Sequence, residues 1–170
     1  PLSNESVIDM RHLNEPSAGY KGFVKRKADG FVTADDKDLR FWMVQLGFTG
    51  DNSSTERWAR RLAKYGVNLG RVQLSSFFGS QVSGDDATFE KRLERLHFHV
   101  AEMKKQGIYT YLGHLYWHTH ATINDGVFPG FGKGKGQKAI ALLFFSKEFQ
   151  DYYIKYVARI MNEKNPYTGM

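Results

Sequence analysis

The chain has 170 residues, of which 41% are hydrophobic and 25% charged, a composition typical of one globular domain with a buried core. It contains no cysteine, which excludes disulfide bonds and thiolate metal sites, and no run of the roughly 18 apolar residues that a membrane span needs. The net charge is +6, but acids alternate with bases along helix-like stretches, so we interpret it as solvated helix faces and expect no nucleic-acid partner.

Residues 1–36 are predicted to form an N-terminal extension. Residues 1–20 are polar and lack periodicity, so this segment is expected to wrap around the domain or fray. Asp29-Gly30 lies between two short apolar pairs, which is typical of a β-hairpin, and the acidic stretch 35–38 predicts a turn.

Residues 37–170 are predicted to alternate strands and helices. In the first helix Ser53 and Glu56 have capping-box spacing, and Gly66 is expected to end it. The predicted elements are a buried strand over 39–48, a helix with Trp58, Leu62 and Tyr65 on one face, a strand over 67–74, a helix capped by Asp85 or Asp86, a strand over 108–116, and a helix from about Ser146 to Asn165-Pro166.

Two of the predicted helices have apolar residues at core-facing spacing. The inward positions are Phe89, Leu93, Leu96, Val100 and Met103 in the second helix, and Phe149, Tyr152, Tyr153, Tyr156, Val157 and Ile160 in the third.

The order strand, helix, strand, helix, strand, helix predicts an α/β fold with a parallel sheet. The joints at Gly66 and Gly107 form a weak internal repeat. An eight-unit barrel needs about 250 residues, so three units do not close one. We expect the first three βα units of a larger barrel, with strands 1–3 and helices 1–3 in residues 37–170, and the remainder of the barrel as their partner.

In parallel α/β folds the chemistry lies at the carboxyl ends of the strands, where the stretch GHLYWHTH falls. We predict a polar and aromatic substrate wall, in which His114 ends the strand and Tyr116 and Trp117 offer flat faces. Ordinary loop histidines are one alternative. A metal site on His118 and His120, about 7 Å apart in an extended segment, is another, but no acidic partner pattern accompanies it, and we predict no metal and no cofactor.

Arg71 stands inside an otherwise apolar strand. Because an unpaired buried charge is very costly, it needs a carboxylate or ligand partner, and we predict a functional arginine over a salt bridge with an edge residue.

Four stretches resemble the N-terminal part of the cellulase-like glycoside hydrolases, the retaining (β/α)8 enzymes related to endoglucanases and β-mannanases. They are FWMVQL at 41–46, LAKYGVNLGR at 62–71, GIYTYL at 107–112 and NPYTG at 165–169. The resemblance runs from about Val7 to the end, and the order of the motifs carries it more than any single motif.

The resemblance implies a substrate-binding set near the cleaved bond. Arg71 matches an arginine near the catalytic carboxylates, His114 matches a histidine of the subsite at that bond, and Trp117 and Phe78 match sugar-stacking aromatics. Gln45 stands where the family often has Asn, and Gly70 where a branched residue is usual. Tyr116 and His118 complete the predicted substrate-binding residues.

The resemblance also implies hydrolysis of β-glucan or β-mannan by two glutamates, one protonating the leaving oxygen and the other forming a covalent glycosyl-enzyme. They follow strands four and seven, so this chain holds no catalytic residue and is expected to be inactive alone. Asn14-Glu15-Pro16 has the letters of the acid/base motif but precedes the first strand, so we predict a turn.

A non-catalytic carbohydrate- or nucleic-acid-binding module and a metal-dependent barrel hydrolase remain as alternative functions. No signal peptide is visible in the sequence, and the resemblance favours a secreted or periplasmic parent.

Overall fold

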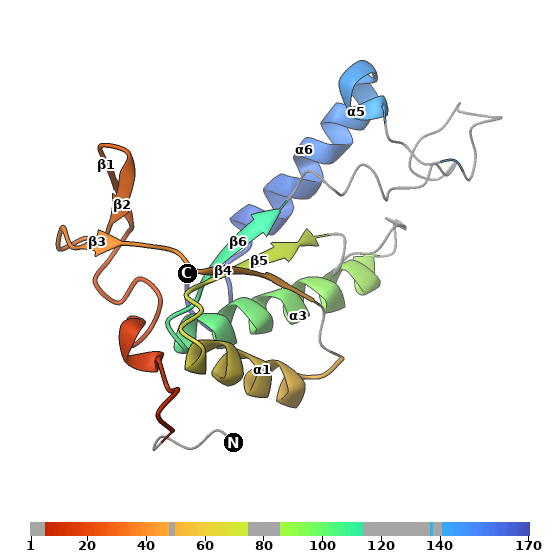
Figure 1. Ribbon diagram of the computed structural model, residues 1–170. Coiled ribbons are helices and arrows are strands. Elements are labelled where there is room, and N and C mark those ends of the chain that lie inside the picture. Colours follow the sequence, from red (N-terminus) through yellow and green to blue (C-terminus); the bar gives the residue numbers. More distant parts are fainter. Residues whose placement is uncertain (1–5, 48–49, 75–85, 114–136, 138–140) are drawn as a thin grey trace. The chain divides into compact units, whose positions relative to one another are not determined.

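The computed structural model describes residues 6–47, 50–74, 86–113, 137 and 141–170 (Figure 1). The chain divides into two compact units, Pro1–Val72 with Phe98–Tyr111, and Gln73–His97 with Leu112–Met170. The domain boundary predicted after residue 36 remains a prediction.

Three strands form a sheet in the order β4-β5-β6, with bounds Met43–Leu46, Leu69–Gln73 and Tyr109–Gly113. β4 and β5 are parallel, in a register that places Gln45 opposite Arg71. Helix α1 (Asn52–Lys64) follows β4, and helix α3 (Asp86–Lys105) follows β5. The predicted α/β class is therefore confirmed.

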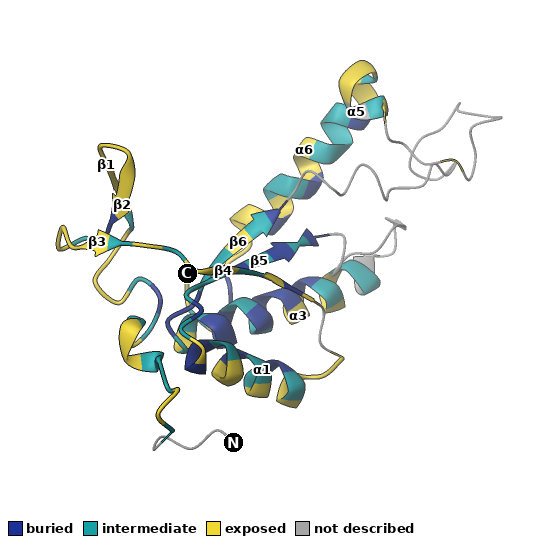
Figure 2. Ribbon diagram, viewed as in Figure 1, coloured by how far each residue is buried: buried dark blue, intermediate teal, exposed yellow. Residues whose placement is uncertain are grey.

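The prediction of a buried strand over 39–48 is wrong in length and in burial. β4 has four residues, and only Leu46 is fully buried, whereas Met43 is 52% exposed and Gln45 is also exposed. Alternate side chains of a strand point to opposite faces. Within the described residues one face of β4 is covered and the other is open, as the burial colours show (Figure 2).

The predicted hairpin is confirmed as part of a second, antiparallel sheet of β1 (Lys25–Lys27), β2 (Gly30–Val32) and β3 (Asp38–Leu39). Its turn lies one residue earlier than the Asp29-Gly30 pair indicates, because Lys27 pairs with Gly30 and leaves Ala28 and Asp29 as the turn residues.

The N-cap of helix α1 lies two residues before the predicted Ser53. Asp51 caps it by accepting a hydrogen bond from the Ser54 N–H at 2.8 Å, in place of the predicted pair of Ser53 and Glu56. The buried face is Thr55, Ala59 and Ala63, and the predicted inward Tyr65 is 43% exposed. Gly66, with φ of +74°, follows the end of the helix, as predicted.

Helix α3 confirms much of its predicted stripe, since Leu93, Leu96 and Met103 are buried. Phe89 and Val100 are only half-buried. In the second half of the helix the buried residues extend beyond one apolar stripe. They include three polar side chains, His97, His99 and Glu102.

Helix α6 (Lys147–Asn162) is capped by Ser146, whose hydroxyl accepts from the Phe149 N–H at 3.3 Å, in agreement with the predicted start. Phe149, Tyr156 and Ile160 are buried, and Tyr152, Tyr153 and Val157 are half-buried. Short helices α5 (Leu142–Phe145) and η1 (Arg11–Leu13, a 3-10 helix) are absent from the sequence-based expectations.

Helices α3 and α6 meet through aromatic and charged side chains of the second unit. The rings of Phe89 and Tyr156 pack edge to face at 6.0 Å, and the Arg159 guanidinium lies 4.2 Å above the Phe89 ring and pairs with Glu90. After α6, the buried Asn165 donates to the His97 carbonyl at 3.0 Å, which fixes the end of the helix against α3.

Candidate functional site

The two described residues of the predicted substrate site lie side by side on adjacent strands. Gln45 of β4 and Arg71 of β5 are register partners, and the Gln45 Nε2 donates to the Arg71 carbonyl at 3.1 Å. Both lie on the face of the sheet opposite the buried Leu46 and Val72. The structure therefore places them together, near the carboxyl ends of their strands.

Gly70 has a packing role beside this pair. A Cβ atom at this position would lie 2.3 Å from the Leu46 Cδ1, because the Leu46 side chain occupies the space that a larger residue would need. Leu46 is 1% exposed. The Leu46 side chain on the neighbouring strand thus fills the space beside Gly70.

The other predicted site residues, Phe78, His114, Tyr116, Trp117 and His118, lie outside the described residues, as does His120 of the metal alternative. Their roles remain predictions.

Within the described ranges no cluster of three or more His, Asp or Glu side chains is placed to hold a metal ion. Nor does any described helix have the length and apolarity to cross a membrane.

The N-terminal segment holds the amino ends of the strands, a role that sequence reasoning missed. The Met10 N–H donates to the Lys64 carbonyl at the end of α1, and the Ala18 N–H donates to the Lys104 carbonyl at the end of α3. Asn14 links the two joints, since its Nδ2 donates to the Val67 carbonyl at 2.8 Å and to the Gln106 carbonyl at 3.5 Å. Of the two expectations for this segment, wrapping is the one that these contacts of Met10, Asn14 and Ala18 support.

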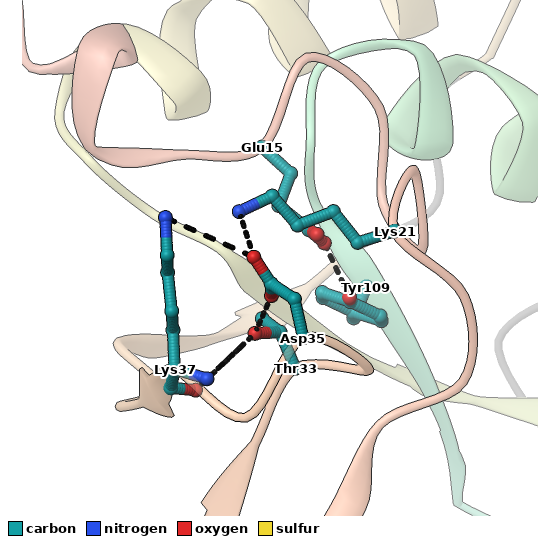
Figure 3. A network of polar contacts seen from close by, with 6 residues as sticks. All are labelled: Glu15, Lys21, Thr33, Asp35, Lys37 and Tyr109. Atoms are coloured by element: carbon teal, nitrogen blue, oxygen red, sulfur yellow. Dashed lines mark hydrogen bonds and ion pairs between the residues drawn. The ribbon is translucent and has the colours of Figure 1, made fainter.

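Glu15 completes this arrangement (Figure 3). The Tyr109 hydroxyl, at the start of β6, donates to the Glu15 Oε2 at 2.5 Å, and the Gly19 N–H donates to the same oxygen at 3.1 Å. Burial, and then Glu15 itself, raises the pKa of Tyr109 to about 12. Glu15 thus makes structural contacts at the start of β6, at the end of the sheet opposite Gln45 and Arg71.

A second cluster in the same view fixes the loop between β2 and β3. Asp35 accepts from Lys21 at 2.7 Å and from the Thr33 hydroxyl at 2.5 Å, and Lys37 lies 3.8 Å away (Figure 3). The hydrogen bond from Lys21, and then that from Thr33, lower the pKa of Asp35 to about 2. This pairing stabilises the loop that connects the small sheet.

Strands β4, β5 and β6 with their helices have the architecture of the first units of a (β/α)8 barrel. The solved endo-1,4-β-mannanase of Rhizomucor miehei matches 88% of this chain with a TM-score of 0.64 at 18% sequence identity. The match covers 44% of the mannanase chain, so this chain spans less than half the length of that protein. The resemblance to the barrel glycoside hydrolases is confirmed at the level of the fold.

Comparisons by sequence gave no match, either to a family model or to a curated protein. The likeness to the mannanase is therefore a likeness of fold.

Proposed function

We propose that this chain supplies the first three βα units of a glycoside hydrolase that cleaves β-linked polysaccharide. The observation that carries the proposal is the joint placement of Arg71 and Gln45 near the carboxyl ends of two parallel strands, in a fold shared with part of a β-mannanase. In such barrels the carboxyl ends of the strands form the active site.

In this proposal Arg71 and Gln45 bind and orient the substrate, and the residues of the stretch 113–120 form one wall of the cleft. Arginine suits this position because its planar group of N–H donors holds a neighbouring carboxylate or a sugar hydroxyl in a fixed direction. Two glutamates outside this chain would perform the reaction, one protonating the leaving oxygen and one attacking the anomeric carbon from about 5–5.5 Å away.

The open face of the sheet supports a larger assembly. Met43, on the face of β4 opposite Leu46, is 52% exposed, Tyr111 of β6 is 51% exposed, and Trp42, just before β4, is 63% exposed. Large apolar side chains exposed in this way are typical of surfaces that pack against another part of a protein. We propose that the remaining strands and helices of the barrel cover these side chains and pair with the open edges of the sheet.

The proposal is tested on the gene product read past Met170. That protein should release reducing ends from soluble mannan or β-glucan with retention of anomeric configuration, as NMR of the first product would record. Arg71→Ala should lower kcat/KM by about 100-fold or more, which corresponds to roughly 3 kcal/mol of transition-state binding.

Arg57→Ala is the matched control, because Arg57 is an exposed arginine of α1, a helix that contributes no residue to the predicted substrate site. It should leave kcat/KM within about twofold. A folded extended product that hydrolyses neither polymer, or one in which the two variants behave alike, would contradict the proposal.

A further inference from the structure

Strand β6 places one further side chain beside the two predicted site residues. β6 runs parallel to β5, since a helix connects the two strands and their arrows point the same way (Figure 1). The Tyr109 N–H donates to the Asn68 carbonyl at 2.9 Å. In a parallel ladder the donating residue lies opposite the residue after the acceptor, which here is Leu69. Two positions further along both strands, Tyr111 therefore lies opposite Arg71.

Tyr111 projects from the open face of the sheet, the face that carries Arg71. Side chains directly opposite one another on neighbouring parallel strands share a face, and Tyr111 is 51% exposed. The next side chain, Thr110, points to the other face, where its hydroxyl oxygen is buried. Gln45, Arg71 and Tyr111 thus form one row across three adjacent strands, which lie about 4.8 Å apart. All three residues belong to the first unit of the chain.

The two tyrosines on this face of β6 differ in the use of their hydroxyls. The Tyr109 hydroxyl donates to the Glu15 Oε2 at 2.5 Å and accepts from the Gly19 N–H at 3.0 Å, so it is committed to the amino ends of the strands. Among the described residues the Tyr111 hydroxyl has no hydrogen-bond partner. Once the remaining strands of the proposed barrel cover the Tyr111 ring, this hydroxyl needs a partner, because buried polar groups are almost always hydrogen-bonded.

The row offers one cation and two neutral polar groups, and it contains no carboxylate. Arg71 supplies N–H donors, and Gln45 stays exposed although its Nε2 donates to the Leu46 and Arg71 carbonyls. A tyrosine hydroxyl both donates and accepts hydrogen bonds, as a sugar hydroxyl does. A neutral sugar therefore suits the position beside Arg71, whereas a carboxylate ligand would use only the donor side of Tyr111.

We propose that Tyr111 is a third substrate-binding residue of this row, and that its hydroxyl forms a hydrogen bond with a hydroxyl of the sugar that Arg71 orients. The inference rests on the proposed function and adds to it a residue that the sequence motifs do not single out. Two contacts from neighbouring strands restrict the rotation of a bound sugar more than one contact does, and this orientation favours reaction.

The test introduces Tyr111→Phe into the gene product read past Met170. This substitution removes only the hydroxyl and keeps the ring that the barrel covers. The value of kcat/KM for soluble mannan or β-glucan should fall about fivefold or more, because one hydrogen bond to the substrate is lost. The midpoint of thermal unfolding should stay close to that of the unchanged protein, which separates substrate binding from a structural role.

Tyr65→Phe is the matched control, because Tyr65 lies at the end of α1, outside the row, and is 43% exposed. It should leave kcat/KM within about twofold. If the extended protein hydrolyses a polymer and Tyr111→Phe behaves like Tyr65→Phe, the role of Tyr111 is overturned and the proposed function stands.

An extended protein that hydrolyses neither polymer contradicts the proposed function, and binding then decides the role of Tyr111. Calorimetry measures the dissociation constants of mannohexaose and cellohexaose for the same three proteins. Binding that is at least fivefold weaker in Tyr111→Phe than in Tyr65→Phe supports the contact. Equal binding by the two variants, or no binding by the unchanged protein, overturns it.

Discussion

The amino ends and the carboxyl ends of the central strands are built in opposite ways. At the amino ends the N-terminal segment donates hydrogen bonds to the backbone of both helix-to-strand joints, through Met10, Asn14 and Ala18. Near the carboxyl ends Gln45 is exposed and Arg71 is only half-buried. The difference indicates that the amino ends hold more of the fixed polar contacts of the first unit, an arrangement that the proposed function requires because barrel enzymes bind their substrates at the carboxyl ends.

We call the amino ends of the central strands, where the N-terminal segment docks, the closed end of the sheet. The largest loss of stability should come from a side chain added there. Gly107 has φ of +72°, and a Cβ there would lie 2.1 Å from the Glu15 carbonyl oxygen, which is backbone and cannot move aside cheaply. Gly107→Ala should therefore lower the free energy of unfolding by about 3 kcal/mol or more, measured by urea denaturation.

Gly169→Ala is its matched control, with φ of +74° and no atom within 4 Å of the added Cβ. It should lower the free energy of unfolding by only about 1 kcal/mol, which is the cost of placing alanine in the left-handed backbone conformation. Equal losses in the two variants would show that the contact with the N-terminal segment adds nothing.

The second prediction concerns the carboxylate of the same segment. Glu15→Ala removes the acceptor of the half-buried Tyr109 hydroxyl and one of the two acceptors of the Gly19 N–H, which keeps its hydrogen bond to the Tyr109 hydroxyl oxygen at 3.0 Å. We expect a loss of about 2 kcal/mol in the free energy of unfolding. Glu15→Gln keeps one oxygen acceptor and should recover part of this loss. If Glu15→Ala leaves the free energy of unfolding unchanged, the Glu15 contacts do not stabilise the closed end, and the prediction is wrong.

The third prediction concerns the pH dependence of stability that the buried His99 of α3 should cause. His99 is 1% exposed, packs against Trp58, and burial lowers its pKa from 6.5 to about 4. The unfolded chain therefore binds the proton more readily between pH 6.5 and pH 4, so stability is fully present above pH 6.5 and is lost as the pH falls through this window. Between pH 7.5 and pH 5.5 the loss should be about 1 kcal/mol.

Urea denaturation at the two pH values measures this loss, with His99→Gln flattening the dependence and the exposed His12→Gln leaving it intact. A pH dependence that survives His99→Gln unchanged would assign the effect to another group.

The smallest prediction compares two amides at the two ends. Asn14 and Gln45 each donate to backbone carbonyls, of Val67 and of Arg71 respectively. Asn14→Ala should lower the free energy of unfolding by about 1 kcal/mol, because the carbonyls of the buried Val67 and the half-buried Gln106 lose their donor. Gln45→Ala should lower it by about 0.5 kcal/mol or less, because water replaces the exposed amide. Thermal unfolding of both variants checks the order; a larger loss from Gln45→Ala would reverse the comparison.

The sequence predicted the features that short-range chemistry determines. The positive-φ glycines at the joints, the Ser146 cap and the apolar residues of α3 each depend on neighbours within a few positions, and the structure confirms them. At α1 the spacing of Ser53 and Glu56 predicted the wrong cap, since the structure has Asp51, two residues earlier, in that position.

The closed end could not be predicted, because its contacts join residues far apart in the chain. Glu15 and Tyr109 are separated by 94 positions, and a polar segment without periodicity gives no local sign of where it docks. The exposed face of β4 was missed for a related reason: an apolar run is equally compatible with burial on one face or on both. Of the candidate site, only the neighbouring positions of Gln45 and Arg71 follow from counting along parallel strands.

The Asn14 contacts have a consequence for how the protein is made. Its two carbonyl partners, on Val67 and Gln106, are 53 and 92 positions further along the chain. At a translation rate of roughly 5–20 residues per second, the first twenty residues leave the ribosome about 5–20 s before their complete docking surface has been synthesised. During that interval the segment is available to a nascent-chain binding factor. The segment can complete its docking only after the joint before the third strand has formed.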